Sequence, residues 1–419
     1  MKIMVIGGGG REHAIIKKLK ENSSVETIWA LPGNGGIARD AECVPVRATD
    51  LDGICAFAAE HPVDYAVVAP DDPLVLGAVD RLNALGIPCF GPTAAAAIIE
   101  GSKAFSKELM KKYGIPTARY EIFSERQAAV DYLKTQKLPI VIKADGLALG
   151  KGVIIAETME DAVAAVDSIM LDKKFGASGD RIVIEEFLTG PEVSVLSFTD
   201  GKTIVPMISS MDHKRAGDGD TGLNTGGMGT IAPNPYYTKE VAARCMEEIF
   251  LPTIRAMAAE GRAFKGCLYF GLMVTPDGPK VIEYNCRFGD PEAQVVLPLL
   301  KTDLLTVMQA VTEERLSEVP VEFEDRYAAC VIMASQGYPV SYQKGYPLEI
   351  PEKLWDSVFV AGAAEKDGKL VTNGGRVLGV TAKADTLQDA VDAAYDMVRE
   401  IRFDNSYYRN DIGARALKA

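Results

Sequence analysis

The pattern Glu-x-Asn in KVIEYNCRFGDPEAQ, residues 280–294, is the strongest chemical signal in the sequence. If KVIEYN is a strand, Glu283 and Asn285 are two residues apart and share one face. Two hard oxygen ligands on one face suit Mg²⁺, which binds a few protein oxygens together with phosphates and water. Arg287 falls on the same face if the strand continues, where it would neutralise a transferring phosphoryl group. A purely structural role is the alternative, and it requires every buried polar group here to be satisfied.

A second group combines lysines with glycines in VIKADGLALGKGV, residues 141–153. Lys143 stands at the end of a predicted strand, where its position would be rigid. Gly146, Gly150 and Gly152 let the following loop approach phosphate oxygens closely, and Lys151 adds a positive charge. The segment differs from the P-loop pattern because no Ser or Thr follows Lys151. A solvated glycine loop is the alternative.

The N-terminal glycines, Gly7 to Gly10, follow a predicted strand and open a helix. Backbone N–H groups and the helix dipole favour an anion at such a place. A dinucleotide fingerprint is missing, because Glu12 or His13 occupies the third glycine position. A smaller phosphate is therefore favoured, and a turn needed only for packing is the alternative. The candidate anion-binding residues are Gly8, Gly9, Gly10 and Arg11.

The segment RIVIEEFLTGPEVSV, residues 181–195, is predicted to be a hinge strand. Its backbone around Phe187 and Leu188 would offer N–H and C=O groups to an adenine edge. Glu185, Glu186 or Glu192 would accept hydrogen bonds from ribose hydroxyls. The alternative is a solvated, acidic strand end.

A glycine-rich loop follows in MDHKRAGDGDTGLNTGGMG, residues 211–229. A loop of this length with so many polar groups is functional more often than structural. Asp212, His213 and Lys214 form a charged cluster immediately before it. His213 is the one histidine of the chain that lies among charged residues.

The elements that would position these residues follow from the hydrophobic pattern. Strands alternate with helices over the first hundred residues, which favours a doubly wound parallel sheet with ligands at its carboxyl edge. One helix is predicted over 73–86. Residues 120–188 form a small α+β module, with Ser124 beginning its first helix. Further on we expect a hairpin around the turn Pro276-Asp277-Gly278 and a second hairpin over 371–384.

Length and composition exclude several classes. The chain has 419 residues, 45 Lys and Arg against 58 Asp and Glu, and a net charge of −13, which argues against binding a nucleic acid. It has no apolar run long enough to span a membrane and no signal peptide. Its seven cysteines lack CxxC spacing. We therefore expect reduced thiols in a cytoplasmic protein, without a disulfide framework or a zinc site.

Taken together and in order, these segments resemble a known family. The motifs are GGGGREHA, GPTAAAAIIEGSKAF, VIKADGLALGKGV, IEEFL, DHKRAGDGDTGLNTGGMG and IEYNCRFGDPE. They resemble the phosphoribosylamine–glycine ligase family of the ATP-grasp superfamily over essentially the whole chain. NTGGMG and RFGDPE are specific to that family, whereas the lysine–glycine loop and Glu-x-Asn are shared across the superfamily.

The resemblance implies an α/β ATP-grasp fold with an N-terminal doubly wound parallel-sheet domain. The implied boundaries are 1–102 for a sugar-phosphate domain, 103–121 with 189–322 for the ATP-grasp core, 122–188 for a small α+β lid, and 323–419 for a C-terminal α+β domain.

The implied reaction joins glycine to 5-phosphoribosylamine with ATP, through a glycyl phosphate, in purine biosynthesis. The implied catalytic residues are Arg287, Asp212 and Lys214. The implied ATP-binding residues are Lys103, Lys143, Gly146, Gly150, Lys151, Gly152, Glu185, Glu186, Leu188 and Glu192. The implied substrate-binding residues are Gly8, Gly9, Gly10, Arg11, Asp212, Thr225, Gly226, Gly227, Met228 and Asp290. Glu283 and Asn285 would hold Mg²⁺ or Mn²⁺, and no nucleic acid, membrane or obligate protein partner is implied.

Two other functions compete with this hypothesis. Another ATP-grasp carboxylate–amine ligase or a carboxylase acting on a nucleotide precursor would carry the same lid and metal motifs. A non-catalytic nucleotide-binding regulator would lose them. Glu283, Asn285, Lys103 and Lys143 are all present, which argues against the regulator.

Overall fold

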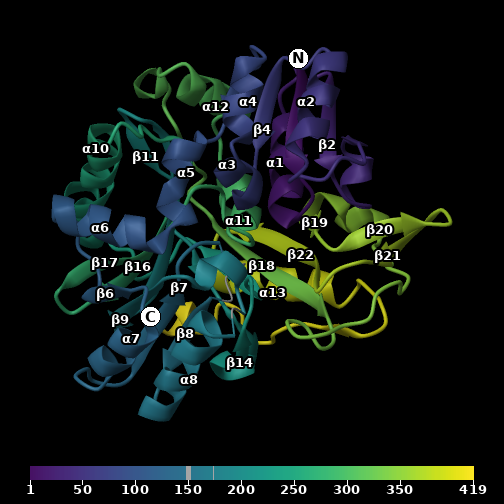
Figure 1. The fold of residues 1–419 in the computed structure, drawn as a ribbon. Helices are drawn as coiled ribbons and strands as arrows, with labels where there is room; N and C mark the ends of the chain where they lie inside the picture. The colour runs from purple at the N-terminus through teal and green to yellow at the C-terminus, as the bar shows by residue number, and fades with distance from the viewer. Residues whose placement is uncertain (148–151, 173) are drawn as a thin grey trace.

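The N-terminal unit is a parallel sheet with strand order β3-β2-β1-β4-β5, drawn in purple and blue in Figure 1. Its strands are β1 (Lys2–Gly7), β2 (Thr27–Pro32), β3 (Glu42–Cys43), β4 (Tyr65–Val68) and β5 (Cys89–Phe90). Its helices are α1 (Gly10–Lys20), α2 (Leu51–Glu60), α3 (Asp71–Leu76), α4 (Ala78–Ala84) and α5 (Ala94–Gly101). Ile3 to Ile6 have no exposed surface, as a parallel strand covered on both faces requires. The prediction of a doubly wound sheet is confirmed.

The helix predicted over 73–86 is wrong in one respect, because the segment forms two helices. Gly77 ends α3 and begins α4 with φ of 91°. A residue in this left-handed conformation cannot continue an α-helix, and glycine adopts it without steric cost.

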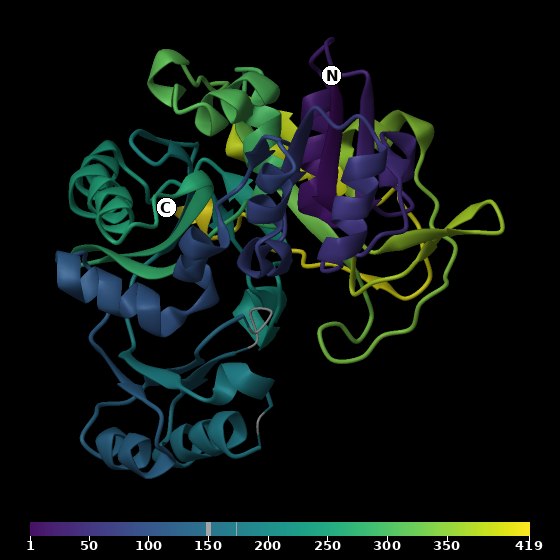
Figure 2. The same cartoon turned by 45° about the horizontal axis from the view of Figure 1, so that its top comes forward.

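The small module is an antiparallel sheet with strand order β6-β9-β7-β8 and two helices. Its elements are β6 (Tyr120–Phe123), α7 (Arg126–Leu133), β7 (Ile140–Ala144), β8 (Val153–Ala156), α8 (Met159–Met170) and β9 (Ile182–Glu186). Ile142, Val166 and Ile184 belong to a hydrophobic cluster made of module residues. Figure 2 shows the module projecting from the rest of the chain. Ser124 does not begin its first helix, because Glu125 is the N-cap residue of α7.

A central antiparallel sheet has the strand order β11-β10-β16-β17. Its strands are β10 (Glu192–Asp200), β11 (Ile204–Pro206), β16 (Lys265–Thr275) and β17 (Gly278–Asn285). The associated helices are α6 (Lys103–Tyr113), α9 (Lys239–Arg244), a π-helical turn (Cys245–Phe250) and α10 (Leu251–Ala259). The hairpin around Asp277 is confirmed, since β16 pairs with β17 in antiparallel register.

The C-terminal sheet has the strand order β12-β15-β18-β22-β19, with β23 on β18. Its strands are β12 (Met211–Asp212), β15 (Gly229–Ala232), β18 (Tyr327–Ser335), β19 (Val358–Val360), β22 (Arg376–Ala384) and β23 (Ser406–Tyr407). Its neighbouring helices are α11 (Ala293–Leu299) and α13 (Leu387–Val398), whereas α12 (Leu304–Thr312) packs against β5, β10 and β16.

Two short hairpins lie outside these sheets. They are β13 (Arg215–Gly217) with β14 (Thr221–Asn224), and β20 (Ala363–Lys366) with β21 (Lys369–Thr372). The hairpin predicted over 371–384 is therefore wrong. β21 pairs with β20, whereas β22 lies between β18 and β19. β22 is largely buried and pairs with a strand on each side, and the short, partly exposed β21 cannot replace either neighbour.

The N-terminal unit, the central sheet and the C-terminal sheet share one hydrophobic cluster. Ile15 from α1, Phe198 from β10 and Ile332 from β18 all belong to it. The structure, a computed structural model, describes residues 1–147, 152–172 and 174–419. In these ranges no helix is both long and apolar enough to cross a membrane. All seven cysteines are free thiols, and five of them are buried.

Candidate active site

The Glu-x-Asn pair lies at the end of β17, as the spacing predicts. Glu283 Oε1 is 3.8 Å from Lys214 Nζ, and Asn285 Oδ1 accepts a hydrogen bond of 3.4 Å from Arg287 Nη2. Burial opposes ionisation of Glu283, but Lys214 and Lys143 lower the pKa of its carboxyl below the ordinary value. The pair therefore presents a carboxylate and an amide oxygen, which are suitable donors for a divalent cation.

Arg287 is held in place by a residue that the sequence did not indicate. Its Nη2 lies 3.1 Å from Glu100 Oε1, and the other carboxylate oxygen of Glu100 accepts a bond of 2.7 Å from the backbone of Cys286. Glu100 lies in the last turn of the apolar helix α5 (Ala94–Gly101), where it is the one charged residue. The sequence signal for Glu100 was a single acidic residue in an apolar helix, but its partner Arg287 lies far away in the sequence.

Lys103 and Lys143 reach the site from different segments. Lys103, at the first position of α6, donates a 2.8 Å hydrogen bond to the carbonyl of Gly146. Lys143, on β7, donates one of 3.1 Å to the carbonyl of Ile282 beside Glu283. Burial lowers the pKa of Lys103, and the charge of Glu283 opposes that shift. The structure thus brings both predicted lysines to the Glu-x-Asn strand.

The lysine–glycine loop is described only at its two ends. Gly146 has φ of 113°, and a Cβ there would lie 2.7 Å from Ser178 Oγ. The carbonyl of Gly152 accepts a 2.8 Å bond from Ala144. Gly150 and Lys151 lie outside the described residues.

The hinge carboxylates are engaged by basic side chains. Glu185 contacts Lys107 and Lys143. Glu186 lies 2.8 Å from Arg119, and Glu192 lies 3.5 Å from Lys214. Leu188 follows β9 and is half-buried. All three carboxylates therefore have basic partners within the protein.

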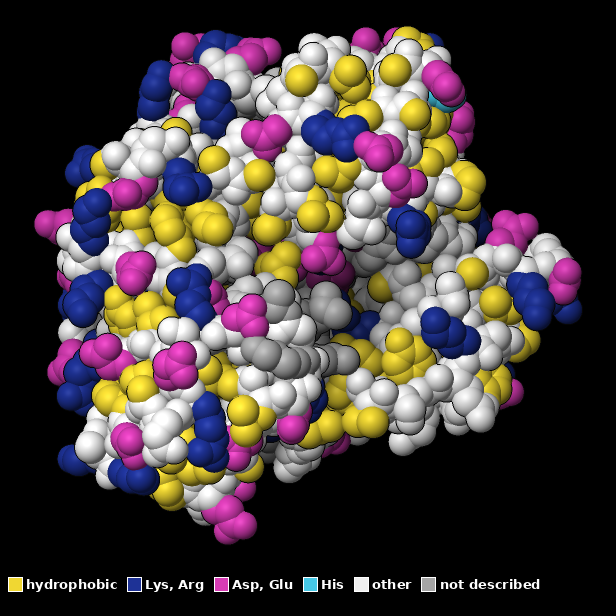
Figure 3. Space-filling model, viewed as in Figure 1, with side chains coloured by type: hydrophobic (Ala, Val, Ile, Leu, Met, Phe, Trp, Pro, Cys, Tyr) yellow, Lys and Arg dark blue, Asp and Glu magenta, His cyan; other side chains and the backbone are white. Residues whose placement is uncertain are grey.

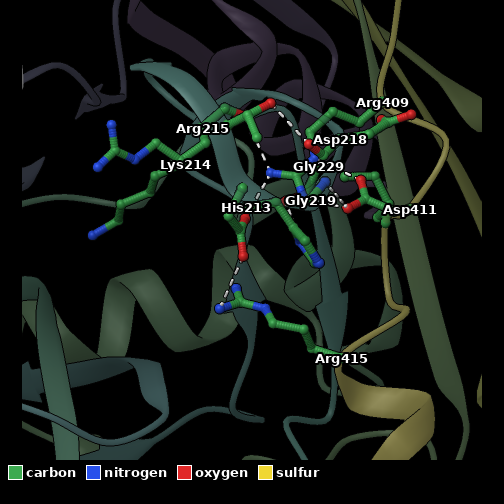
Figure 4. A network of polar contacts seen from close by, with 12 residues as sticks. His213, Lys214, Arg215, Asp218, Gly219, Gly229, Arg409, Asp411 and Arg415 are labelled. Atoms are coloured by element: carbon green, nitrogen blue, oxygen red, sulfur yellow. Dashed lines mark hydrogen bonds and ion pairs between the residues drawn. The ribbon is translucent and has the colours of Figure 1, made fainter.

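The glycine-rich loop is only partly a loop, which corrects the prediction. Its outer part is the hairpin β13–β14, whose tip binds the C-terminal segment (Figure 4). The backbone N–H of Gly219 donates to Asp411 at 2.8 Å, and Arg409 Nη1 lies 2.9 Å from Asp220. These polar groups of the tip have protein partners in the C-terminal segment, so the tip binds that segment.

His213 is a buried structural residue, although the sequence places it among charges. Its Nε2 accepts a 3.1 Å bond from the backbone N–H of Gly413, and its Nδ1 faces the carbonyl of Gly229. Burial lowers the pKa of His213 to about 4, so the ring is neutral at pH 7. In Figure 4, Lys214 points away from this network, and its Nζ is the atom that lies 3.8 Å from Glu283 Oε1.

The inner part of the same segment does lie at the site. Asp212 is held on β12, and burial with the nearby charge of Glu292 raises the pKa of its carboxyl. Thr225 donates to the carbonyl of Lys214 at 2.9 Å. Met228 has no exposed surface, so its side chain is not open to a ligand.

A cavity of about 400 Å³ lies between the N-terminal unit and the C-terminal elements. Figure 3 shows the surface hollowed there. Its lining residues come from seven separate segments: Gly7, Gly8, Gly9, Arg11, Glu12, Ala48, Pro70, Asp290, Tyr338, Ala361, Gly362 and Arg376. Four predicted substrate-binding residues are among them, namely Gly8, Gly9, Arg11 and Asp290. Gly10 is not, since it packs against Gln294 of α11.

Arg376 and Tyr338 complete the cavity wall, and the sequence assigned them no role. Arg376 Nη1 lies 3.4 Å from Asp290 Oδ1 and donates to the carbonyl of Gly226 at 2.8 Å. Tyr338 accepts a 3.0 Å bond from the N–H of Gly226. The two glycines before Arg376 were the available signal, but nothing nearby in sequence points to the cavity. Arg376 Nη1 also lies 3.4 Å from the carbonyl oxygen of Gly227, so Gly226 and Gly227 both lie beside the cavity.

Two lysines from separate segments, a Glu-x-Asn strand and a small antiparallel module facing them define an ATP-grasp protein. Profiles of the phosphoribosylglycinamide synthetase family match the chain in three parts. The N domain matches residues 1–100, the ATP-grasp (A) domain 101–293 and the C domain 328–415.

Full-length relatives agree with these profiles. Phosphoribosylamine–glycine ligase of Caldanaerobacter subterraneus subsp. tengcongensis is 46% identical over 415 residues, covering 99% of this chain and 100% of the relative. The protein of the same name from Halalkalibacterium halodurans is 46% identical over 419 residues, covering 100% and 97%. The chain belongs to the phosphoribosylglycinamide synthetase family.

Solved structures agree as well. The crystal structure of phosphoribosylamine–glycine ligase from Thermotoga maritima superimposes with a TM-score of 0.88 at 35% identity, covering 98% of this chain and 100% of that one. A biotin carboxylase from Campylobacter jejuni superimposes with a TM-score of 0.75 at 14% identity, covering 97% and 92%. The second similarity concerns the fold alone.

Proposed function

We propose that this protein is an ATP-dependent ligase that joins glycine to 5-phosphoribosylamine, giving glycinamide ribonucleotide, ADP and phosphate. The observation that carries the proposal is the path of RFGDPE. This segment leaves the Glu-x-Asn strand at Asn285, passes Arg287 and reaches the cavity wall at Asp290, five residues further on. One short segment thus joins the phosphoryl-transfer residues to a pocket for a second substrate.

On the ATP side, the chain supplies positive charge and no nucleophile of its own. Lys103, Lys143 and Lys214 surround Glu283, so they would neutralise the phosphates of bound ATP. The backbone at the end of β9, around Leu188, would meet adenine, and Glu192 the ribose. A carboxylate oxygen of glycine attacks the γ-phosphorus, ADP leaves, and a glycyl phosphate forms. Such a transfer depends on positioning and charge neutralisation.

On the amine side, the cavity residues would hold the phosphate of phosphoribosylamine. The N–H groups of the glycine turn and the guanidinium of Arg11 are suited to an anion. The amine nitrogen attacks the acyl carbon of glycyl phosphate, phosphate leaves, and the nitrogen loses a proton. Asp212 and Asp290 are the candidates for contact with the ammonium group of glycine.

Glu283 and Asn285 would hold Mg²⁺ or Mn²⁺ together with ATP. Two oxygen donors on one face fit a cation that takes most of its other ligands from phosphates and water. When bound, the cation supplies charge neutralisation on the phosphates.

Residues 122–188 are proposed to form a lid that excludes water, since an acyl phosphate hydrolyses readily. The domain boundaries at residues 102, 122, 189 and 323 remain part of this proposal. Free cysteines favour the reducing cytoplasm as its location.

The test is a phosphate-release assay on the purified protein with ATP, Mg²⁺ and freshly prepared 5-phosphoribosylamine. Phosphate release is expected with glycine and not with alanine or without an amino acid. Hydroxylamine should trap a glycyl derivative. Equal release without glycine, or release that requires bicarbonate, would instead favour another ligase or a carboxylase of this superfamily.

A further inference from the structure

Three charged side chains meet in the interior where α6 packs against the module. Lys107 of α6 lies 2.8 Å from Glu185 Oε2, and Lys143 of β7 lies 3.0 Å from Glu185 Oε1. The three side chains are 2%, 4% and 4% exposed for Lys107, Lys143 and Glu185. We call these residues the Lys107–Glu185–Lys143 triad. Burying charged groups costs free energy even when they are paired, so the burial of this triad needs an explanation.

The ammonium group of Lys107 is bound to protein groups in the interior. It donates a 2.7 Å hydrogen bond to Thr117 Oγ1, which itself donates to the carbonyl of Val281 on β17. Burial lowers the pKa of Lys107 to about 8, and the charge of Glu185 opposes that shift. Burial opposes ionisation of Glu185 in turn, but Lys143 and Lys107 lower its pKa below the ordinary value. The carboxylate and the two ammonium groups thus depend on one another.

Lys143 keeps hydrogen-bonding capacity within this arrangement. Its ion pair with Glu185 Oε1 lacks hydrogen-bond geometry, since that oxygen has no hydrogen-bond partner among the described residues. Its ammonium group has three donors, and one of them is used by the carbonyl of Ile282. Glu185 Oε1 lies 3.0 Å from the same ammonium group, which leaves one N–H donor for a ligand beside Glu283.

The charges of the triad do not cancel. One carboxylate lies between two ammonium groups, which leaves a net charge of one positive unit. A Glu185–Lys143 pair alone would be neutral, and a neutral pair attracts phosphate much less.

We infer that Lys107 is a positioning residue for nucleotide binding: it shares Glu185 with Lys143, so that Lys143 is fixed against β17 and still presents positive charge to the phosphates. This inference rests on the proposed function, in which Lys143 contacts ATP. Lys107 itself touches no substrate.

The test measures the Kd of MgADP by calorimetry for four variants of the full chain. Lys107→Met leaves the triad neutral, and we expect MgADP to bind at least tenfold more weakly. Lys107→Met combined with Glu185→Gln restores the net positive charge, so this double variant should bind MgADP at least threefold more tightly than Lys107→Met alone. Lys107→Arg keeps the charge and should also bind within threefold. Lys111→Met, an exposed lysine one turn along α6, is the matched control and should leave binding unchanged.

If Lys107 had only a structural role, adding Glu185→Gln to Lys107→Met would weaken MgADP binding further. A recovery of MgADP affinity in the double variant is therefore not expected from a structural role. The inference is overturned if Lys107→Met binds as tightly as wild type, or if the double variant binds no better than Lys107→Met. Should Lys107→Met fail to fold, Lys107→Arg decides alone, and a tenfold loss of MgADP affinity in that variant contradicts the inference.

Failure of the proposed function would look different. A wild-type protein that does not bind MgADP at all refutes the nucleotide site itself. If the wild-type protein binds MgADP but the affinities of the variants do not follow the net charge of the triad, only the role of Lys107 is refuted.

Discussion

Glu283 is the residue on which the proposed chemistry depends most. Glu283→Gln removes a carboxylate charge while keeping the shape of the side chain, so we expect turnover to fall by about 100-fold or more. The melting temperature should stay within a few degrees of wild type, because the residue is only partly buried. Glu121→Gln, an exposed change on β6, is the control. Near-normal turnover of Glu283→Gln would contradict the metal assignment.

Arg376 offers a prediction for the second substrate. Its guanidinium joins Asp290 to Gly226 at the cavity, so Arg376→Met should raise the KM for 5-phosphoribosylamine by about 10-fold or more, by the loss of charged hydrogen bonds. The KM for ATP should change little. Initial rates at varied concentrations of each substrate measure the two effects. An equal change in both KM values would mean that the cavity is not the amine site.

At the scale of residues, local spacing predicted one part of the site and missed another. Glu283, Asn285 and Lys143 could be found because strand periodicity and adjacent glycines are local properties. Glu100, Lys107 and Arg376 could not, since their partners lie far away in the sequence. Such contacts arise only when the elements pack.

At the scale of elements, the C-terminal segment stabilises the glycine-rich loop. Arg409 is 1% exposed and binds Asp220 and Asp411, which are partly exposed. Arg409→Met should reduce the free energy of unfolding by about 2–3 kcal/mol, less than for a fully buried pair because water reaches the partner carboxylates. Arg415→Met is the control, because Arg415 is 53% exposed and contacts the same Asp220 at 3.4 Å. Urea unfolding measures both, and an equal loss would contradict the prediction.

His213 makes the same region sensitive to acid. Its pKa is about 4 in the folded chain against an ordinary value of 6.5, so between these values the unfolded chain binds a proton that the folded chain does not. The free energy of unfolding should therefore fall as pH decreases from 6.5 to 4, by up to about 1.4 kcal/mol per unit from this group. His213→Gln should have a shallower slope in urea unfolding at pH 7, 6 and 5. Identical slopes would show that the ring does not titrate in this way.

Sequence patterns predicted elements well where one segment decides its own structure. The parallel strands of the N-terminal unit and the hairpin around Asp277 are of this kind. The prediction of a hairpin over 371–384 was wrong because β22 pairs with β18 and β19. No local pattern in the sequence predicts that pairing. Likewise, the loop after Arg215 forms a hairpin whose tip binds Asp411 and its neighbours.

At the scale of the whole molecule, the module has a hydrophobic core of its own. Ile142→Ala, at a site with no exposed surface, should destabilise the module by about 2–5 kcal/mol and speed amide exchange within residues 120–186 alone. Ile332→Ala in the shared cluster should speed exchange in β1, β10 and β18 together. Hydrogen exchange read by mass spectrometry compares the two. Uniform acceleration by Ile142→Ala would contradict the independence of the module.

The cavity is lined by residues from early and late parts of the chain, so it can form only after most of the chain has been synthesised. Arg11 emerges from the ribosome near the start of translation, but Tyr338 and Arg376 follow only after most of the chain has been made. The backbone N–H of Val360 in β19 donates a 2.8 Å hydrogen bond to His13 of α1. Helix α1 therefore gains this hydrogen bond only after residue 360 has been synthesised. A nascent chain can therefore fold the parallel sheet early, yet it acquires the complete pocket only near the end of its synthesis.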